Sequence, residues 1–357
     1  MLTSTRFDPP NERETMQPMS KLDADSLRGY YRKFARFEAA GASPIYAAWA
    51  AGVAEDDEII ALLLELPKPK RQANLLFAAA RHLGAGDGIT PGERPSTAGT
   101  NDYASLRTWL LAHWPATRDL MLARSTQTNE AGRCAVLLPA LARVERPISL
   151  IEVGASAGLC LYPDRYSYTY RTDSGPVTLH PKDGPSTVEL VCELTNAQPP
   201  DTIPEVAWRA GIDLNPLDIT DGDQQEWLRS LIWPEHETRR ARLSAASALV
   251  AADPPRLVPG DLLETVEGLL DEAPADTQKV VFHSAVLAYV APDEREKFAA
   301  LIRMRDDIVW ISNEGSGVLP DIGAQVDREP DGRFVLAVDG EAIALTGPHG
   351  QSFEGQE

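Results

Sequence analysis

From residue 126 onward, short apolar runs alternate with helical stretches, and this alternation limits the possible folds more than any other feature of the sequence. Strands separated by helices form βαβ units, in which neighbouring strands run parallel and helices cover the sheet. The pattern therefore predicts an α/β fold with a mostly parallel sheet. The expected strands lie at 148–153, 205–214, 280–290 and 307–315 and within 256–264, followed by a terminal antiparallel hairpin at 334–347.

Three further segments depart from this alternation. Residues 1–20 contain three prolines and no apolar periodicity, which predicts a disordered arm. Residues 21–125 carry only helical patterns, such as the capping pair Ser43–Pro44, and are expected to form an all-helical N-terminal domain. Within the sheet domain, 126–357, alternating tyrosines indicate a β-rich insertion at about 162–204.

Charge and hydropathy exclude several classes of partner. The net charge of −19 lies entirely beyond residue 125, and so acidic a surface repels a phosphate backbone, which argues against a nucleic-acid partner. Mean hydropathy is −0.25, and no apolar run approaches the ~20 residues of a membrane span. The polar first 20 residues lack a secretory leader, so we expect a cytoplasmic protein. Three cysteines without C-x-x-C spacing and scattered histidines predict neither a disulfide framework nor a metal site.

The segment EVGASAG, residues 152–158, follows the first expected strand and is the best candidate for a ligand site. In open α/β sheets, ligands bind at the carboxyl ends of the strands. Gly154 permits a sharp turn, Gly158 permits close packing, and small residues such as Ser156 let a ligand approach the backbone. A carboxylate at Glu152 suits a ligand with hydroxyls or a cationic amine better than a pyrophosphate. Since the dinucleotide and P-loop fingerprints are absent, this favours S-adenosylmethionine over NAD or ATP.

The pattern E-x-G-x-S-x-G resembles the first motif of class I S-adenosylmethionine-dependent methyltransferases, with Ser156 in place of the middle glycine. GIDLNPLD resembles the end of their second core strand, which implies that Asp213 holds the ribose hydroxyls. PGDLLE resembles the third strand end, which implies that Asp261 and Leu262 flank the adenine. VVFHSAVLAYVAPDEREKF resembles the fourth strand and the helix after it, with His283 facing the site. The resemblance implies a Rossmann-like methyltransferase-type sheet, S-adenosylmethionine as cofactor, S-adenosylhomocysteine as product and a small-molecule acceptor.

A second resemblance covers nearly the whole chain. TQTNEAGR, LIEVGASAGL, RAGIDLNPLD and ALTGPHG resemble an uncharacterised bacterial domain-of-unknown-function family. The methyltransferase resemblance covers about residues 126–347, and it implies that the polar segment 126–129, with Asn129, closes over the methionine end of the cofactor. The alternative for that segment is a linker with a capping threonine at the start of a helix over 126–144.

Each candidate residue also has a structural interpretation. Glu152 could cap a following helix, and Asp213 and Asp261 could be ordinary strand-end or helix-capping aspartates. His283 and Glu314 are candidates for catalytic residues on the acceptor side. The alternatives are a hydrogen-bonded buried histidine and a turn residue, respectively.

Three functions remain open from the sequence. The first is methyl transfer from S-adenosylmethionine to an unidentified acceptor. The second is a methyltransferase-like binding or regulatory protein without catalytic activity. It is motivated by Ser156 and by the 61 residues between Glu152 and Asp213, where a standard nucleotide-binding unit has ~20. A weaker third is an NAD-dependent oxidoreductase. The sequence does not determine the oligomeric state.

Overall fold

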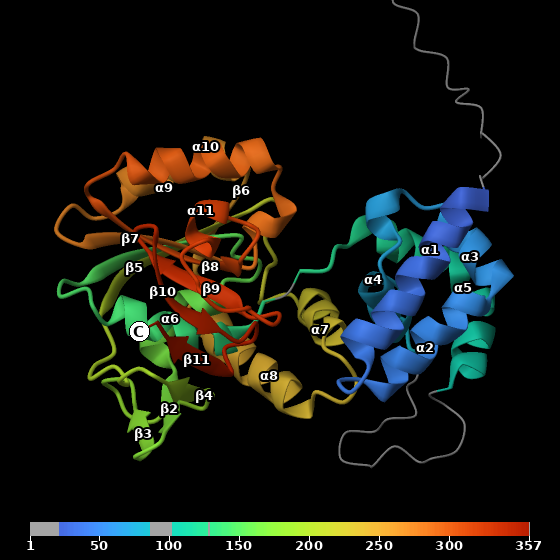
Figure 1. The fold of residues 1–357 in the computed structure, drawn as a ribbon, viewed down its shortest axis with the longest axis horizontal. Helices are drawn as coiled ribbons and strands as arrows, with labels where there is room; N and C mark the ends of the chain where they lie inside the picture. Colours follow the sequence, from blue (N-terminus) through green and yellow to red (C-terminus); the bar gives the residue numbers. More distant parts are fainter. Residues whose placement is uncertain (1–20, 86–101, 128, 357) are drawn as a thin grey trace, which may run out of the picture. The chain divides into compact units, whose positions relative to one another are not determined.

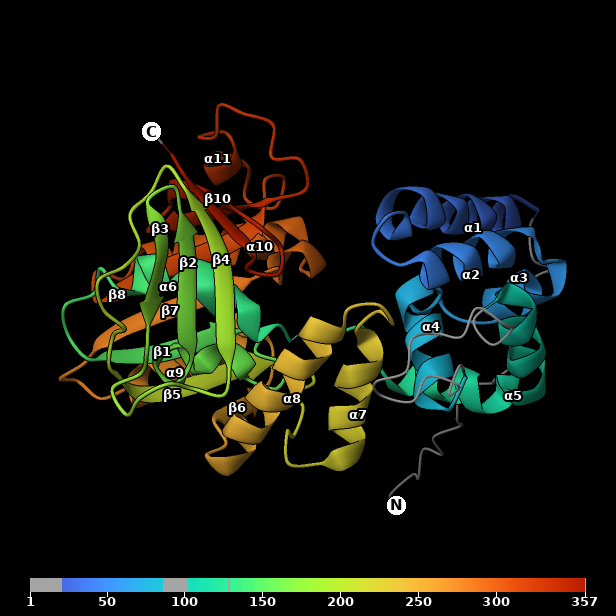
Figure 2. The ribbon, with the colours of Figure 1, turned by 90° about the horizontal axis from the view of Figure 1, so that it is seen from below.

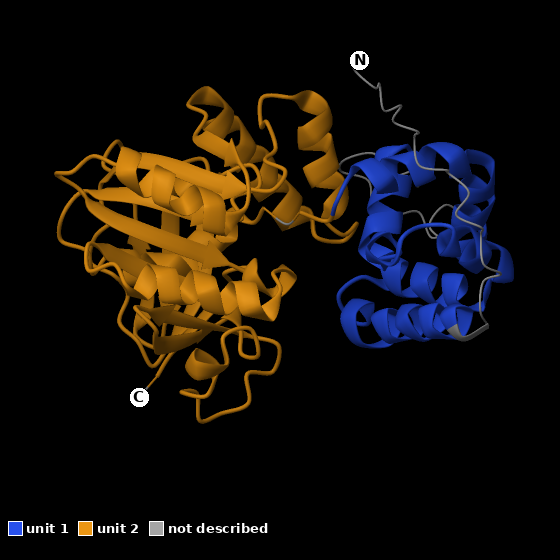
Figure 3. Ribbon diagram, turned by 90° about the horizontal axis from the view of Figure 1, so that it is seen from above, with its two compact units in different colours: residues 1–125 blue, residues 126–357 orange. Residues whose placement is uncertain are grey.

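The computed structural model describes residues 21–85, 102–127 and 129–356. They divide into two compact units, residues 1–125 and 126–357, which Figure 3 distinguishes by colour. The segment 1–20, predicted as a disordered arm, lies outside the described residues. No helix in the described ranges is both long enough and apolar enough to cross a membrane.

The described part of the N-terminal unit is helical, as the sequence predicts. Two of its helices begin where a polar side chain accepts a hydrogen bond from the first turn: Ser43 Oγ accepts from Tyr46 N at 3.1 Å, and Asp102 Oδ1 accepts from Ser105 N at 2.8 Å. The last helix of this unit continues through Pro115 to Ala123. The elements are α1 (Lys21–Lys33), η1 (Phe34–Ala39), α2 (Pro44–Glu55), α3 (Asp57–Leu64), η2 (Lys68–Lys70), α4 (Ala73–His82) and α5 (Tyr103–Ala123).

The C-terminal unit is built on one mixed sheet of eleven strands. Its order is β3-β2-β4-β11-β10-β9-β8-β7-β1-β5-β6 (Figure 1). The strands are β1 (Ile148–Val153), β2 (Ser167–Thr172), β3 (Gly175–Leu179), β4 (Glu189–Thr195), β5 (Val206–Asp213), β6 (Arg256–Pro259), β7 (Gln278–Ser284), β8 (Ile308–Gly315), β9 (Phe334–Val338), β10 (Glu341–Thr346) and β11 (Ser352–Gly355).

Helices cover both faces of this sheet (Figures 1 and 2). Apolar residues of α9, α10 and α11 pack with Ile151 and Val281 on one face. Residues of α6 and α8 pack with Leu150 and Val280 on the other, because successive strand side chains point to opposite faces. The helical elements are η3 (Ala131–Arg133), α6 (Cys134–Leu141), η4 (Leu159–Leu161), η5 (Pro163–Arg165), α7 (Gly222–Leu231), α8 (Glu237–Ala252), α9 (Leu262–Glu272), η6 (Leu287–Tyr289), α10 (Pro292–Arg303) and α11 (Pro320–Gly323).

Five neighbouring strands, β6-β5-β1-β7-β8, form a wholly parallel core. In chain order along the core they are the third, second, first, fourth and fifth strands, which is the start of the strand order of doubly wound sheets. After β1 the chain builds β5 and β6 on one side and then returns to the other side with β7. The carboxyl end of β1 is therefore the switch point at which such sheets bind ligands.

The remaining strands extend the sheet at the β8 edge. The hairpin β9–β10 turns at Asp339 and Gly340, both with positive φ (52° and 86°), as the Asp-Gly pair predicts. The insertion between β1 and β5 supplies β2, β3 and β4, and β4 pairs in parallel with β11. These three strands therefore continue the sheet in the hydrogen-bonding direction, beyond the terminal strand β11.

Candidate functional site at the carboxyl end of the parallel core

The chain turns sharply after β1, and glycine is required at two points of this turn. Gly154 has φ +73°, and a Cβ there would lie 2.3 Å from Cγ2 of Val286. Gly158 has φ +74°, and a Cβ there would lie 2.7 Å from Cγ of Pro255. Residues with a side chain rarely adopt this left-handed backbone conformation, so the turn depends on both glycines. Ser156, which replaces a glycine of the methyltransferase motif, also has a positive φ of 52°.

The backbone of the turn is held by the protein itself. Gly154 N and Ala155 N donate to Ile212 O at 2.8 and 3.0 Å. Asn129 joins the two ends of the turn, because its Nδ2 donates to Ala155 O at 2.8 Å and its Oδ1 accepts from Leu159 N at 2.9 Å. The chain then continues into the short 3-10 turns η4 and η5 rather than into an α-helix. The turn therefore offers neither a helix N-terminus nor free amides at these positions to a phosphate group.

Glu152 lies at the end of β1, is 4 % exposed, and has a carboxyl oxygen, Oε2, that is buried without a hydrogen-bond partner. Burial raises the pKa of this carboxyl well above its usual range; Cys160 and Asp213 raise it further, and Arg133 opposes the shift. The predicted alternative, a carboxylate capping the next helix, is wrong because the chain forms η4 there. Ser156 Oγ is also buried without a partner. The strand end thus holds two polar groups that the protein leaves unsatisfied.

Asp213 lies at the end of β5 and is half-buried. Its Oδ2 accepts from Ser156 N at 2.8 Å, and its Oδ1 accepts from Asn215 N at 2.8 Å and from Gln127 Nε2 at 3.3 Å. A carboxylate has about four acceptor positions, so one remains for another donor. Leu214, the next residue, is 70 % exposed beside this carboxylate.

Asp261 and Leu262 occupy the start of α9. Asp261 Oδ1 accepts from Leu263 N at 2.8 Å, which makes it the N-cap of this helix. Leu262 is buried in the apolar cluster between α9 and the sheet. The structure therefore gives Asp261 the helix-capping role that the sequence left as its alternative, and Leu262 a core position.

His283 is fully buried, and both of its ring nitrogens are engaged. Trp310 Nε1 can only donate, and it lies 3.1 Å from His283 Nε2, so Nε2 accepts and the proton is on Nδ1. Nδ1 then donates to Glu314 Oε1 at 2.7 Å. His283 is thus the satisfied buried histidine of the alternative interpretation, and it has no free nitrogen for a substrate.

Glu314, at the carboxyl end of β8, is 3 % exposed and is not a turn residue. Its carboxylate accepts from Val286 N at 3.0 Å and from Leu287 N at 3.1 Å in addition to His283. These bonds fix the loop after β7. The side chain of Val286, in this loop, occupies the position next to Gly154 that a Cβ would need. Glu314 therefore positions the wall of the turn rather than facing a substrate.

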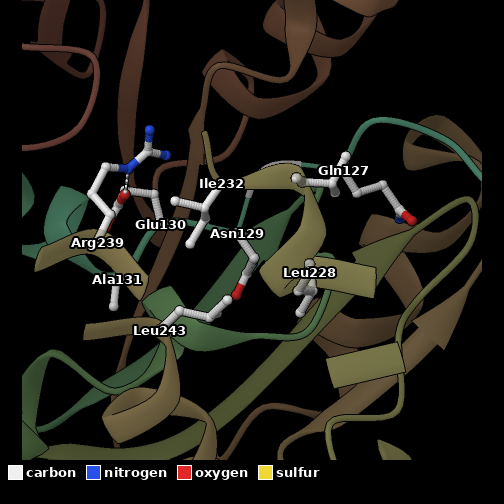
Figure 4. Close-up of a pocket in the computed structure, with 9 residues that line it drawn as sticks. Gln127, Asn129, Glu130, Ala131, Leu228, Ile232, Arg239 and Leu243 are labelled. Atoms are coloured by element: carbon white, nitrogen blue, oxygen red, sulfur yellow. Dashed lines mark hydrogen bonds and ion pairs between the residues drawn. The ribbon is translucent and has the colours of Figure 1, made fainter. Parts of the chain in front are cut away.

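A narrow pocket with a cavity volume of about 30 Å³ lies next to the turn (Figure 4). Two of its residues tie it to the strand ends: Asn129 binds both ends of the turn, and Gln127 donates to Asp213 and, at 2.8 Å, to Asn215 O. Its lining combines polar residues of the segment before α6 with apolar residues of α7 and α8. The lining residues are Gln127, Asn129, Glu130, Ala131, Leu228, Leu231, Ile232, Arg239 and Leu243.

Glu130 anchors two arginines of α8 at this pocket. Its Oε2 accepts from Arg239 Nε at 2.7 Å, and its Oε1 accepts from Arg242 Nε at 2.8 Å and from Gly132 N at 3.1 Å. Although burial opposes ionisation, the two guanidinium groups lower the pKa of Glu130 from 4.5 to about 2. Among the described residues, no group of three or more His, Cys, Asp or Glu side chains is arranged to hold a metal ion.

The structure brings some predicted residues together and adds others. Glu152, Gly154, Ser156, Gly158, Asp213 and Asn129 form one contiguous site around the turn. Sequence reasoning missed Glu130 and its arginine partners, which are separated from it by 109 and 112 residues. The only sequence signal was the spacing of Arg239 and Arg242, three residues apart on one helix face, and that spacing is common on exposed helices.

A search of curated proteins finds no match to the chain. A family model does match: it is described as "Uncharacterized protein conserved in bacteria" (DUF2332) and covers residues 28–354. This range includes nearly all of the described residues of both units. The chain therefore belongs to this bacterial family.

Proposed function

We propose that the C-terminal unit binds S-adenosylmethionine at the carboxyl ends of β1 and β5 and transfers its methyl group to a small molecule. The parallel core supports this proposal, since its strand order places the EVGASAG turn at the switch point where doubly wound sheets bind ligands. The same turn carries the sequence resemblance to the first methyltransferase motif.

The observation that carries the proposal is the state of Glu152. A buried polar atom without a hydrogen-bond partner costs about 1–3 kcal/mol, so Oε2 of Glu152 is a cost that a ligand donor would remove. A ligand with an amino group or hydroxyls provides such a donor. S-adenosylmethionine has both and carries no phosphate.

The neighbouring groups favour the same kind of ligand. Asp213 keeps one acceptor position that a ribose hydroxyl can fill. The amides of Gly154, Ala155 and Ser156 are used inside the protein, which disfavours a pyrophosphate and hence NAD.

The chemistry needs positioning more than acid–base help. The methyl group of a sulfonium is already activated, so the protein has to align an acceptor in line with the carbon–sulfur bond. His283 and Glu314 are engaged with each other and with backbone or Trp310 donors. The acceptor is therefore one that is nucleophilic without losing a proton to either residue.

Isothermal calorimetry with S-adenosylhomocysteine tests the proposal. We expect binding by the full chain, weaker binding by Glu152→Gln, and no comparable heat with NAD or NADP. The exposed Glu193, paired with Arg171 on the surface, supplies the matched control Glu193→Gln, which should bind like the wild type. Absence of heat at millimolar S-adenosylhomocysteine would overturn the proposal.

A binding protein without catalytic activity is the second candidate. It is favoured by the engagement of Asp213 with three protein donors and by the absence of a free base at His283 or Glu314. Methyl-labelled S-adenosylmethionine distinguishes the two functions. Binding without label transfer to a broad panel of small molecules would select the second candidate.

A further inference from the structure

The pocket beside the turn combines an apolar wall with a cationic end. Leu228 of α7, Ile232 just after α7 and Leu243 of α8 supply apolar side chains, and Arg239 lies at the other end of the lining (Figure 4). Arg239 uses Nε for its bond to Glu130, and its two terminal nitrogens point away from that carboxylate (Figure 4). One of them, Nη1, lies 3.4 Å from His236 Nδ1, a weak contact.

The charge around this end is positive. Arg239 and Arg242 share the single negative charge of Glu130, and Arg133, whose Nε and Nη1 donate to Pro348 O and Ser284 O, adds a third cation nearby. Glu152 does not offset this charge because burial favours its neutral form. A positive interior is notable in a chain with a net charge of −19.

His349 provides an independent observation of the same field. It is mostly buried, and its Nδ1 has no hydrogen-bond partner. Burial, followed by the charge of Arg239, lowers the pKa of His349 to about 4; Arg133 and His236 act in the same direction, and Glu130 opposes them. Burial and the neighbouring arginines therefore disfavour an additional cation beside Arg239.

We propose that this pocket binds an organic carboxylate with an apolar body, with the carboxylate on Arg239 and the body against Leu228, Ile232 and Leu243. A guanidinium presents two parallel N–H donors to a carboxylate, and such charge-assisted bonds are among the strongest in proteins. The apolar wall distinguishes this ligand from inorganic anions.

A carboxylate also fits the proposed function, on which this second step rests. It is ionised at pH 7, so its oxygen can attack a sulfonium methyl group without a base. The new carbon–oxygen bond forms as the carbon–sulfur bond breaks, and the electron pair of the carbon–sulfur bond stays on sulfur. The products are a methyl ester and S-adenosylhomocysteine, and no further reactant is needed. Gln127 and Asn129 connect the pocket to Asp213 and to the turn, which places it next to the proposed cofactor.

Calorimetry with octanoate, octanamide and acetate on the full chain tests the binding. Octanoate should bind, and octanamide, which lacks the charge, should bind weaker by about tenfold or more. Acetate and inorganic phosphate should bind weakly because they lack the apolar body. Equal affinity for octanoate and octanamide, or for octanoate and acetate, would contradict the proposal.

Variants locate the site. Arg239→Gln should weaken octanoate binding by about tenfold or more, and Arg239→Lys should weaken it less because the charge remains. The control Arg171→Gln makes the same charge change at an exposed ion pair and should not alter binding. Unchanged affinity in a folded Arg239→Gln protein would overturn the assignment, and if that variant misfolds the ligand series above still decides.

The outcomes separate the two proposals. Octanoate binding without S-adenosylhomocysteine binding would refute the proposed function and leave the carboxylate pocket standing. Binding of S-adenosylhomocysteine without octanoate binding would refute the pocket alone. Methyl octanoate formed from octanoate and S-adenosylmethionine would support both, and its absence with both ligands bound would refute the acceptor role.

Discussion

Two buried glutamates beside the same turn have opposite surroundings. Glu130 accepts from two guanidinium groups and a backbone amide, and its pKa is lowered to about 2. Glu152 keeps one oxygen without a partner, and burial raises its pKa well above the usual range. Both side chains are nearly inaccessible, at 5 % and 4 % exposure.

The contrast teaches that burial alone does not set the charge of a carboxyl group. Desolvation favours the neutral form of both glutamates, and only Glu130 has cations close enough to reverse it. The Glu130 carboxylate is therefore fully paired within the protein, whereas Oε2 of Glu152 has no hydrogen-bond partner. This difference separates a carboxylate paired in an ion cluster from a buried carboxyl group without a partner at Oε2.

Removing the charge of Glu130 should have the largest effect. In Glu130→Gln, Arg239 and Arg242 lose their common counterion in a mostly buried place. The shift from 4.5 to about 2 corresponds to a loss of about 3 kcal/mol in the free energy of unfolding at pH 7. Calorimetric unfolding of the full chain measures it, and a loss below about 1 kcal/mol would contradict the ion-cluster interpretation.

The pH dependence of this stabilisation by Glu130 follows from its lowered pKa. The folded protein holds Glu130 ionised more strongly than the unfolded chain does, so the stabilisation is present above pH ~4.5 and is lost as pH falls toward about 2. The difference between wild type and Glu130→Gln should shrink over that range. The exposed pair Glu193–Arg171 provides the control, since Glu193→Gln should cost at most about 1 kcal/mol.

The Glu152 side of the comparison depends on the shape of the turn, which Gly154→Ala tests. Alanine at φ +73° costs about 1 kcal/mol, and its Cβ would also overlap Val286, so we expect a loss of about 2 kcal/mol together with weaker binding of S-adenosylhomocysteine. Gly332 is a matched control, because it has φ +78° and no atom within 4 Å of an added Cβ. Gly332→Ala should show the backbone cost alone.

Adding Val286→Ala to Gly154→Ala removes the overlapping methyl groups. The two substitutions should therefore be non-additive, with the double variant losing less than the sum of the single variants. Strict additivity would mean that the contact with Val286 does not shape the turn. The unfolding of the three variants and the wild type gives the complete cycle.

Local patterns predicted most of the fold. The strand expected at 148–153 has those bounds, the one expected at 307–315 is Ile308–Gly315, and the terminal antiparallel hairpin is confirmed. The helix expected to start at residue 126 instead begins its first turn at Ala131, because Gln127 and Asn129 are used to bind the strand ends. Hydrophobic periodicity does not reveal such a tertiary role.

The electrostatics of the site were beyond sequence analysis. Glu130 is paired by arginines more than 100 residues away in the sequence, whereas Oε2 of Glu152 has no hydrogen-bond partner in the fold. The hydrogen bonding of His283 likewise depends on Trp310 and Glu314, which reach it only through the pairing of β7 with β8. Motif position located the strand ends but not the state of their side chains.

The smallest predicted effect on stability is that of Glu152→Gln, which should stabilise the protein, whereas the other substitutions should destabilise it. In the ligand-free protein, folded Glu152 keeps its proton at pH values where the unfolded chain has lost it, so the stability of the wild type falls as pH rises above ~4.5. Glu152→Gln has a neutral side chain of similar shape and escapes this loss. Its melting temperature should therefore exceed that of the wild type, with the largest excess near pH 8 and none near pH 4.

The same substitution should weaken binding of S-adenosylhomocysteine, because a glutamine cannot become the carboxylate that an amino group attracts. A variant that gains stability while losing affinity shows a side chain kept for a ligand at the expense of the fold. Glu193→Gln, which changes an exposed carboxylate, should alter neither quantity in this way. If Glu152→Gln lowered the melting temperature at pH 8, Glu152 would be a structural group like Glu130, and the contrast between the two glutamates would disappear.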